Sequence, residues 1–474
     1  MVVGSLTVET DVVVIGGGPG GYVAAIRAAQ LGKDVMLVDE NKSLGGVCLN
    51  TGCIPTKAMI HASDFFHTIK EMESMGISIK DYSVNIEKMR EWKNGIVQKL
   101  AGGVSMLCKK HGVEVLEGRA IFVSKNELRI EGKSDVNKVK FKNAIIATGS
   151  HEIEIPGFPF KDELVISSKD ALDLKEIPKN LVIIGGGYIG TEMGTVYGKL
   201  GSNVTIIEAM DRLIPSLQES IVSVVANKLK EFNVKTIFNA KALSYESRDG
   251  KAYVKISVDG KESEVEADKI LVVVGRKPNT EGIGLEAVNV KLDEKGFIAV
   301  DETMKTSSDN IYAVGDVVGQ PMLAHKASRE GKVAVEAICG LPSAFDNKVI
   351  PFVVFNDPEI ASVGMTEEEA KKKGHEIIKG KFPFTALGRA MTLNQTDGFV
   401  EVIADKKTKI VLGVHAVGPN VSDMISEAAL AIEMNATLED IVSTIHPHPT
   451  IPESLMEAAE AAMNQSVHIF TPKK

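Results

Sequence analysis

The chain has 474 residues, and its 54 basic and 63 acidic residues give a net charge of −9. This balance argues against bulk binding to nucleic acid or to an anionic membrane, and no apolar run reaches the length that spans a bilayer. Residues 1–6 lack the features of a signal peptide, and the chain has four cysteines. Both observations favour the cytoplasm, where a lone disulfide is usually catalytic.

The first recognisable unit is a strand, a glycine-rich turn, a helix and a second strand. An apolar strand at 11–15 runs into 16–21, Gly-Gly-Gly-Pro-Gly-Gly, which fits G-x-G-x-x-G. A helix at 22–31 and a strand at 35–38 follow, and Asp39 ends that strand. The glycines let the backbone approach a pyrophosphate, the helix N-terminus stabilises its charge, and the acid binds ribose hydroxyls. This unit predicts a dinucleotide site.

Two cysteines come next, Cys48 and Cys53, five positions apart. A structural staple is a weak explanation, since so short a loop contributes about 2 kcal/mol. A metal half-site lacks a second pair of ligands, and two inert buried thiols remain an alternative. A helix start predicted at 54–57 and the nearby Lys57 would both stabilise a thiolate. Gly52 permits the bend that a bridge between the thiols needs. These features favour a redox-active dithiol.

The pattern of the first unit recurs in the second quarter of the chain. A strand at 181–184 leads into 185–190, Gly-Gly-Gly-Tyr-Ile-Gly, then a helix to Leu200 and a strand at 204–207 that ends in Glu208. The first glycine and the acid are 23 positions apart in both units, 39 − 16 and 208 − 185. Two such units in the same context predict two bound dinucleotides. An acid at Glu208 favours NAD over NADP.

A strand at 311–315 ends at Asp316, and apolar and helical segments follow. Asp316 is a candidate partner for flavin ribityl or phosphate groups, and capping of a following helix explains it equally well. From residue 351 onward, strands at 352–355, 399–403 and 410–414 and helices at 424–434 and 452–463 indicate a separate α+β unit. Glycine- and proline-rich boundaries predict four regions, 1–150, 151–279, 280–350 and 351–474.

Two histidines, His446 and His448, stand in a proline-rich segment before a helix predicted to start after Pro452. Thiol–disulfide exchange needs a base, and a histidine oriented by a carboxylate such as Glu453 suits that task near neutral pH. A zinc site lacks an evident third ligand. Local sequence supports a catalytic base and a pair of exposed loop histidines about equally.

A dithiol does not readily pass a hydride to nicotinamide directly, whereas a flavin accepts electrons from a thiolate and exchanges hydride with NAD. One dinucleotide site would therefore hold FAD and the other NAD. Both cysteines lie within 14 residues after Asp39, in the first unit, so FAD belongs to that unit. The expected fold class is α/β, with two Rossmann-like dinucleotide-binding domains of a duplicated three-layer type and a C-terminal α+β dimerisation domain.

With these residues in view, the chain resembles the flavin-dependent pyridine nucleotide–disulfide oxidoreductases, and within them the dihydrolipoamide dehydrogenase family. The resemblance covers essentially the whole chain. It implies an FAD-binding domain at 1–150, an NAD-binding domain at 151–279, a central domain at 280–350 that completes the FAD site, and an interface domain at 351–474. The stretches 48–57 and 322–327 point to the lipoamide branch, and the superfamily shares the others, which are 16–21, 147–149, 185–190, 274–280, 313–316 and 446–450.

The resemblance implies a role for several side chains. Cys48 would exchange with the substrate, Cys53 would lie against the flavin, and Glu453 would orient the base His448 toward the cysteines of the other subunit of a homodimer. Lys57 would sit beside the flavin and pair with Glu192, and Tyr188 would cover the flavin until nicotinamide displaces it. The implied cofactor contacts come from Gly16, Gly18, Pro19, Gly20, Gly21, Asp39, Glu40, Gly46, Val47, Ala120, Ala147, Thr148, Gly149, Ser150, Gly185, Gly187, Ile189, Gly190, Glu208, Val274, Gly275, Arg276, Gly315, Asp316, Met322, Leu323, Ala324 and His325.

The implied reaction oxidises dihydrolipoyl groups, carried on lipoyl domains or carrier proteins of 2-oxoacid dehydrogenase or glycine cleavage complexes, with NAD⁺. A glutathione or coenzyme A disulfide reductase is the first alternative, although the apolar helix after Cys53 better suits a hydrocarbon lipoyl arm. A flavoprotein subunit whose main task is docking within such a complex is the second. Pro447 stands where the family more often has a small residue, which puts the substrate fit in question.

Overall fold

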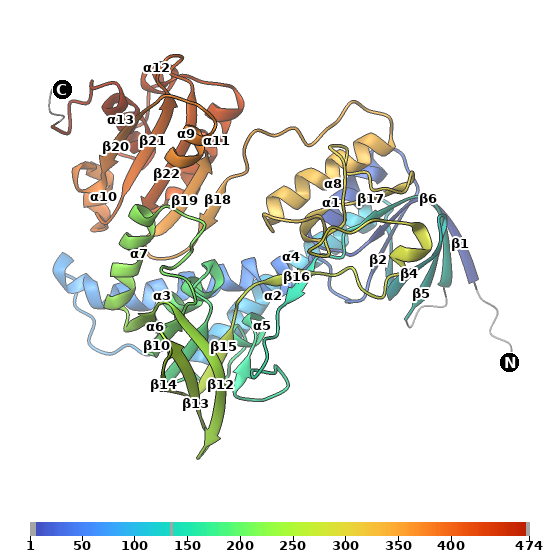
Figure 1. Cartoon of the computed structure of the whole chain (residues 1–474), viewed down its shortest axis with the longest axis horizontal. Helices are drawn as coiled ribbons and strands as arrows, with labels where there is room; N and C mark the ends of the chain where they lie inside the picture. Colours follow the sequence, from blue (N-terminus) through green and yellow to red (C-terminus); the bar gives the residue numbers. More distant parts are fainter. Residues whose placement is uncertain (1–5, 133–135, 471–474) are drawn as a thin grey trace.

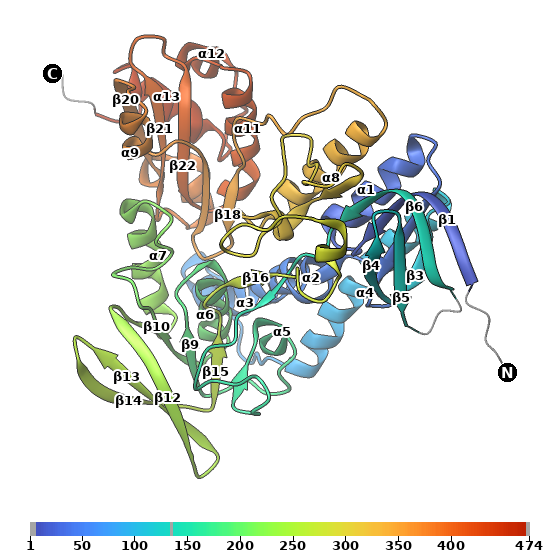
Figure 2. The ribbon, with the colours of Figure 1, turned by 45° about the vertical axis from the view of Figure 1, so that its right-hand side comes forward.

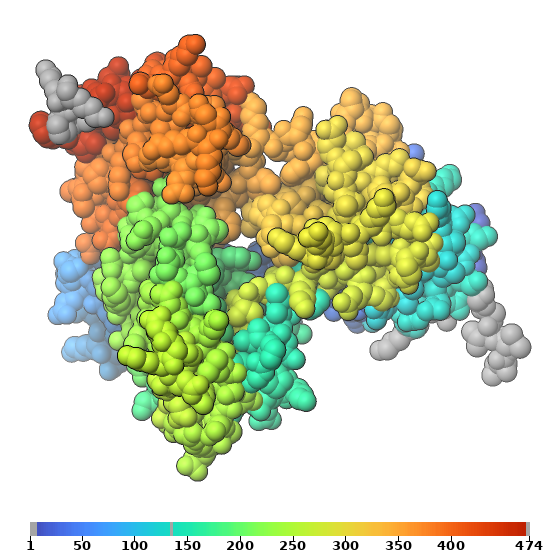
Figure 3. Space-filling view, viewed as in Figure 1, coloured from blue at the N-terminus to red at the C-terminus, as the bar shows by residue number. Residues whose placement is uncertain are grey.

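The computed structural model describes residues 6–132 and 136–470. The expectation that the chain has no signal peptide rests on residues 1–6, and of these, residues 1–5 lie outside the described residues. Residues 471–474 also lie outside them. Figures 1 and 2 show three groups of elements around a central region, and Figure 3 shows three lobes on one face of the molecule. Within the described ranges, no helix combines the length and the hydropathy needed to cross a bilayer.

The first glycine-rich turn lies on a seven-stranded sheet of order β3-β2-β1-β6-β5-β4, with β17 paired to β6. Strands β1, β2, β3, β6 and β17 are parallel, so the carboxyl ends of β1, β2 and β17 meet at one edge. The elements of this region are β1 (Leu6–Ile15), α1 (Pro19–Gln30), β2 (Val35–Asp39), α2 (Gly46–Thr51), α3 (Cys53–Glu71), η1 (Met72–Met75), α4 (Ile86–Lys110), β3 (Glu114–Glu117), β4 (Arg119–Ser124), β5 (Glu127–Glu131), β6 (Val136–Ile146) and β7 (Ser150–Glu152).

The second glycine-rich turn lies on a parallel sheet of order β11-β10-β9-β15-β8. Alternate residues of a strand face opposite sides of a sheet. Ile183 therefore packs with the helix side of the core, and Val182 packs with the antiparallel sheet β12-β13-β14 on the other side. The elements are β8 (Val165–Ile166), α5 (Ser168–Ala171), β9 (Asn180–Ile184), α6 (Tyr188–Lys199), β10 (Asn203–Ile207), α7 (Glu219–Glu231), β11 (Val234–Ile237), β12 (Ala240–Arg248), β13 (Lys251–Val258), β14 (Lys261–Ala267), β15 (Lys269–Val272) and β16 (Arg276–Pro278).

The chain then returns to the first sheet before it forms the C-terminal unit. The returning elements are η2 (Leu285–Val288), β17 (Ile311–Ala313), η3 (Gly315–Val318) and α8 (Ala324–Ile338). The C-terminal unit has an antiparallel sheet of order β18-β19-β22-β21-β20. Its elements are β18 (Phe352–Val354), β19 (Glu359–Gly364), α9 (Glu367–Lys372), β20 (Ile377–Pro383), η4 (Phe384–Ala386), α10 (Gly388–Leu393), β21 (Phe399–Asp405), β22 (Val411–Gly418), α11 (Val421–Glu433), α12 (Leu438–Ser443) and α13 (Glu453–Ala462).

The predicted fold class is confirmed. Both glycine-rich turns join a parallel strand to a helix, the second unit has its antiparallel third layer, and an α+β unit follows. The expected helices and strands overlap those of the structure, but several ends differ. The helix expected to start at 54–57 is α3, which begins at Cys53, and α2 has no counterpart among the expected elements.

Candidate active site

Two helices meet at Gly52 and carry one cysteine each. Helix α2 begins after Gly45, whose φ of 110° favours glycine, and places Cys48 in its first turns. Gly52, at φ −136° and ψ −110°, leaves the helical region, and α3 begins at Cys53 in a new direction. Because the chain bends at Gly52, positions five apart face each other, which a continuous helix would prevent.

The two thiols have opposite pKa shifts. A hydrogen bond from Cys48 lowers the pKa of Cys53 the most, burial opposes that shift, and Lys57 lowers the value further, to about 7. The same hydrogen bond and burial raise the pKa of Cys48. Cys53 is therefore the thiol that ionises near neutral pH, and a thiolate is the reactive form of a cysteine.

Lys57 and Glu192 form an ion pair between α3 and α6. Lys57 Nζ lies 2.9 Å from both carboxylate oxygens of Glu192, whose side chain is 4% exposed. The backbone N–H of Phe355, just after β18, donates to Glu192 Oε1 at 2.9 Å, and Lys57 Nζ lies 4.6 Å from the Phe355 ring centroid. Three regions of the chain thus meet one turn beyond Cys53.

A cavity of about 520 Å³ contains both cysteines and the first glycine-rich turn. Asp39 is fixed at its edge, because Gly17 N–H donates to Oδ2 at 2.5 Å and Asn41 N–H donates to Oδ1 at 2.7 Å. No acidic side chain lies in the first turn of α1, so the positive end of that helix is free of competing charge. Of the predicted site residues, the cavity is lined by Gly16, Gly18, Pro19, Gly20, Asp39, Gly46, Val47, Cys48, Cys53, Lys57, Ala147, Thr148, Gly149, Ser150, Tyr188, Ile189, Glu192, Arg276, Gly315, Asp316, Met322 and Ala324.

The second glycine-rich turn lines another cavity, of about 780 Å³. Glu208 occupies the position that Asp39 has in the first. Gly186 N–H donates to its Oε2 at 2.6 Å, and Met210 N–H donates to its Oε1 at 2.8 Å. The predicted site residues on this cavity are Gly185, Gly187, Tyr188, Ile189, Glu208, Val274, Gly275, Arg276, Met322 and Leu323. The duplication in the sequence thus corresponds to a duplicated geometry of glycine-rich turn and acid.

Tyr188 belongs to the walls of both cavities. Its ring meets Phe352 edge-on with centroids 6.1 Å apart, and burial raises the pKa of its hydroxyl to about 12. Arg276 also lines both cavities, and its Nε donates to Ser150 Oγ at 2.7 Å. The two cavities therefore share a wall that contains an uncharged aromatic side chain.

Asp316 is one of the residues that line the first cavity. It lies inside η3 rather than before a helix, and Ser150 Oγ donates to its Oδ2 at 2.5 Å. Helix capping, the alternative explanation, therefore does not describe this residue. Asp316 therefore lines the cavity with one carboxylate oxygen already paired to Ser150.

His446 and His448 have different surroundings. His446 has a side chain that is 4% exposed, and its Nε2 lies 2.8 Å from Glu427 Oε1. His448 is 78% exposed, and its Nδ1 lies 2.8 Å from Glu453 Oε1. Thr450 N–H fixes the other Glu453 oxygen at 2.6 Å. His448 thus presents Nε2 outward, oriented by a held carboxylate, and neither His448 nor Glu453 lines the cavity with the cysteines.

Comparison with known proteins decides the family. The family described as pyridine nucleotide-disulphide oxidoreductase matches residues 10–331, and its dimerisation domain matches residues 350–459. The chain belongs to this family. It is 48% identical to a dihydrolipoyl dehydrogenase of Geobacillus stearothermophilus and 49% identical to one of Bacillus subtilis, over 99% of this chain and 100% of each relative.

Solved structures of the family agree with the fold. The HOCl-induced flavoprotein disulfide reductase RclA from Escherichia coli matches with a TM-score of 0.85 at 28% identity, over 95% of this chain and 99% of that one. LpdA from Mycobacterium tuberculosis matches with a TM-score of 0.88 at 25% identity, over 95% and 99%.

Several predicted site residues of this oxidoreductase do not line either of the two cavities. Gly21 and Gly190 face the carbonyl oxygens of Gly16 and Gly185, where a side chain has no room, so they permit helix–strand packing. The others are Ala120, buried in β4; Glu40, 3.6 Å from Arg119; and His325, whose Nε2 lies 2.8 Å from the Pro351 carbonyl.

Two residues that were not among the predicted site residues contact the oxidoreductase site through hydrogen bonds. Asn279 Nδ2 donates to the Thr148 carbonyl at 2.8 Å and lines the first cavity, and its place in the 274–280 motif could have drawn attention to it. Phe355 contributes a backbone N–H to Glu192. No local pattern marks Phe355, because its role depends on a contact between distant segments. Within the described residues, no group of three or more histidine, cysteine, aspartate or glutamate side chains could hold a metal ion.

Proposed function

We propose that this chain is a dihydrolipoyl dehydrogenase, which oxidises dihydrolipoyl groups with NAD⁺ through a Cys48–Cys53 disulfide and FAD. The observation that carries the proposal is the position of Cys53, an acidic thiol in a cavity that shares the Tyr188 wall with a second dinucleotide cavity. Relatives named dihydrolipoyl dehydrogenase along the full length support the substrate class.

The residues of the first cavity fit FAD. Gly46, at φ 59°, lies so close to the glycine-rich turn that an added Cβ would be 2.7 Å from the Gly18 Cα. The turn and the N-terminus of α1 suit a pyrophosphate, Asp39 suits ribose hydroxyls, and Asp316 suits a ribityl chain. When bound, FAD would supply an acceptor for the electron pair of the dithiol and a donor of hydride to nicotinamide.

The residues of the second cavity fit NAD. Glu208 turns its carboxylate toward the space where the ribose of a dinucleotide would lie, and two backbone N–H groups hold it there. A carboxylate accepts hydrogen bonds from a 2′-hydroxyl and repels a 2′-phosphate. This supports NAD rather than NADP as the coenzyme.

The side chains of the chain supply the thiol chemistry. A substrate thiolate attacks Cys48 Sγ, the Cys48–Cys53 bond breaks, and Cys53 leaves as a thiolate that Lys57 stabilises. The second substrate thiol then attacks the first substrate sulfur, which forms the cyclic lipoyl disulfide and releases Cys48, and its proton passes to Cys48, which ends as a thiol. His448 accepts the proton of the first substrate thiol, and Glu453 stabilises the imidazolium through Nδ1.

A second copy of the chain completes this site. His448 is exposed and lies away from the cysteine cavity of its own chain, and a dimerisation domain matches the region that contains it. A homodimer would bring the partner's exposed imidazole to the cysteines.

We infer four domains, at 1–150 for FAD, 151–279 for NAD, 280–350 for the central domain and 351–474 for the interface. We also infer a cytoplasmic location. The substrates would be dihydrolipoyl groups on lipoyl domains or carrier proteins of a 2-oxoacid dehydrogenase or related complex.

Gly46→Ala tests the FAD site. The added methyl meets the Gly18 backbone and strains a left-handed residue, so FAD affinity should fall on the order of tenfold or more. The ratio of flavin to protein absorbance in purified enzyme measures this. Gly76→Ala is the matched control, because Gly76 also has a positive φ, 82°, with nothing within 4 Å of its added Cβ. Equal flavin loss in both variants would contradict the FAD site.

A turnover panel tests the proposed function. Purified yellow enzyme is supplied with dihydrolipoamide and NAD⁺, with oxidised glutathione and NADPH, or with coenzyme A disulfide and NADH. We expect rapid turnover for the first pair alone. Rapid reduction of glutathione or coenzyme A disulfide would move the chain to the alternative reductases. No turnover with any pair, in enzyme that retains flavin, would leave a docking subunit as the better description.

A further inference from the structure

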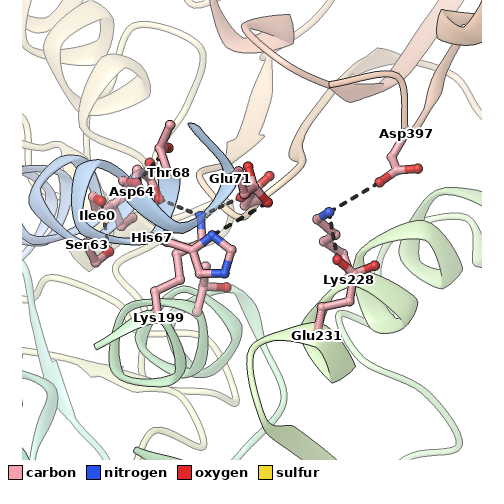
Figure 4. Close-up of polar contacts among 12 residues, drawn as sticks. Ile60, Ser63, Asp64, His67, Thr68, Glu71, Lys199, Lys228, Glu231 and Asp397 are labelled. Carbon is pink, nitrogen blue, oxygen red and sulfur yellow. Dashed lines mark hydrogen bonds and ion pairs between the residues drawn. The ribbon is translucent and has the colours of Figure 1, made fainter. Parts of the chain in front are cut away.

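A second polar cluster joins the same helices as the Lys57–Glu192 pair. Lys199, on α6, has a side chain that is 1% exposed, and its Nζ lies 2.6 Å from Asp64 Oδ1 on α3 and 2.5 Å from Asp357 Oδ2 after β18. The ring of Phe232 lies against the same ammonium, with its centroid 4.7 Å away. Figure 4 shows Lys199 reaching from α6 to Asp64 on α3.

The two ion pairs repeat along the helices with opposite signs. Asp64 follows Lys57 by seven residues on α3, and Lys199 follows Glu192 by seven on α6. Seven residues are two helical turns, about 10 Å along the axis. Both helices therefore run in the same direction through the contact. A slip of two turns would set Lys57 against Lys199, so the reversed signs specify one register of α3 against α6.

The segment after β18 touches both pairs. Phe355 donates its backbone N–H to Glu192 and lays its ring beside Lys57, and two residues later Asp357 binds Lys199. A shift of this segment that broke the Asp357 contact would also displace the Phe355 N–H from Glu192. The buried ammonium of Lys199 is thus placed to hold a segment of the C-terminal region against the active site.

We propose that Asp64, Lys199 and Asp357 form a positioning cluster that locks α3, α6 and the segment after β18 in one register, and thereby holds Lys57 and Glu192 beside Cys53. The cluster touches neither cysteine and does not line the cavity that contains them. Its members are positioning residues. The inference rests on the proposed redox role of Cys53.

Loss of the cluster should make Cys53 a weaker acid. Lys57 lowers the pKa of Cys53 more than Glu192 raises it, so displacement of the pair removes a net stabilisation of the thiolate. Other charged and titratable groups around the cluster on the packed elements are His61, His67, Lys70, Glu71, Lys228 and Glu359.

The test is a pH titration of the long-wavelength absorbance that a Cys53 thiolate gives against oxidised flavin, in holoenzyme carrying Cys48→Ser. Adding Lys199→Met should raise the midpoint by on the order of half a pH unit, less than the loss of an adjacent charge causes. Lys199→Arg keeps the positive charge and should bring the midpoint most of the way back to the reference value. An unchanged midpoint in Lys199→Met, with flavin retained, would overturn the proposal.

A second variant separates position from charge. Lys199→Met removes a positive charge, which by itself would raise the pKa of Cys53 through the field. The combined variant Lys199→Met with Asp357→Asn keeps the net charge of the cluster and still removes the contacts. We expect the raised midpoint to persist in it. Return of the midpoint to the reference value would show a field effect alone and overturn the proposal.

Lys228→Met is the matched control. Lys228, on α7, also reaches the C-terminal region, where its Nζ lies 3.6 Å from Asp397 Oδ2, and Figure 4 shows that contact apart from Lys199. Its loss should leave the midpoint unchanged, and an equal shift would overturn the proposal. If Lys199→Met does not fold, Asp357→Asn alone should give a smaller rise, and no rise would count against the cluster. A reference enzyme without a near-neutral titration would instead contradict the proposed role of Cys53.

Discussion

Cys48→Ser should reduce dihydrolipoamide turnover on the order of a thousandfold or more while the purified enzyme stays yellow. A serine hydroxyl is a poor nucleophile and cannot form the disulfide with Cys53. Cys48 lines the cavity and is a half-buried free cysteine, so the substitution changes one atom at a partly accessible position. Activity, flavin content and thermal melting of the variant measure the effect.

The same variant gives a pH dependence. The pKa of Cys53 is lowered to about 7, so the thiolate should be present above that pH and disappear as the pH falls below it. A hydroxyl at position 48 can donate the hydrogen bond that Cys48 provides. The long-wavelength absorbance of the thiolate against flavin should therefore increase as the pH rises through about 7 and be lost as the pH falls below it.

Cys339→Ser is the matched control for Cys48→Ser. Cys339 is a half-buried free cysteine at the end of α8, away from both cavities. Its replacement should leave turnover and the absorbance unchanged. Loss of flavin together with unfolding in Cys48→Ser would instead show that Cys48 is a structural cysteine.

His448→Gln should lower turnover by about a hundredfold to ten-thousandfold, the range that general acid–base catalysis contributes. His448 is exposed and its Nδ1 is held by Glu453, so the loss removes a base without opening a core. Glu453→Gln should cause a smaller loss, since it leaves the imidazole in place. Steady-state kinetics across pH measure both effects.

His468→Gln is the control with the same local chemistry. His468 follows α13 in the chain and has a side chain that is 66% exposed. Its Nδ1 lies 2.5 Å from Oε1 of Glu457, which is on α13. Its replacement should leave turnover unchanged. An equal loss in both histidine variants would point to a structural role for this region rather than to a base at His448.

Mixed dimers test whether the base comes from the other subunit. One subunit carries Cys48→Ser and the other carries His448→Gln. If each site takes its cysteines from one chain and its histidine from the other, one site in the mixed dimer is intact and half of the wild-type activity per dimer should return. If both groups come from one chain, each site has a defect and no activity returns.

The cysteines and the glycine-rich turns could be found from the sequence because each depends on short-range order. The equal spacing to Asp39 and Glu208 follows from a strand, a turn and a helix of fixed length. The structure gives both acids the same two backbone donors, the second glycine of the turn and the residue two after the acid. The bend at Gly52 was also a local prediction, and the structure has it between α2 and α3.

The support around the dithiol could not be found in this way. The family resemblance named Lys57 and Glu192, but no local pattern pointed to the Phe355 N–H that fixes their pair or to Asp64 and Asp357 on Lys199. The distinction between a buried His446 side chain and an exposed His448 likewise depends on Glu427, which lies on α11.

By itself, the sequence determined the fold class, the two glycine-rich units, the pair of close cysteines and the family. Backbone geometry and residue spacing within a few dozen positions are enough for the first three, and the family follows from a resemblance along essentially the whole chain. Only the tertiary structure decided which face of the second cavity meets the first, which histidine is exposed, and how three regions converge on Cys53. Burial and ion pairing between segments more than a hundred residues apart set those features, and no local pattern encodes them.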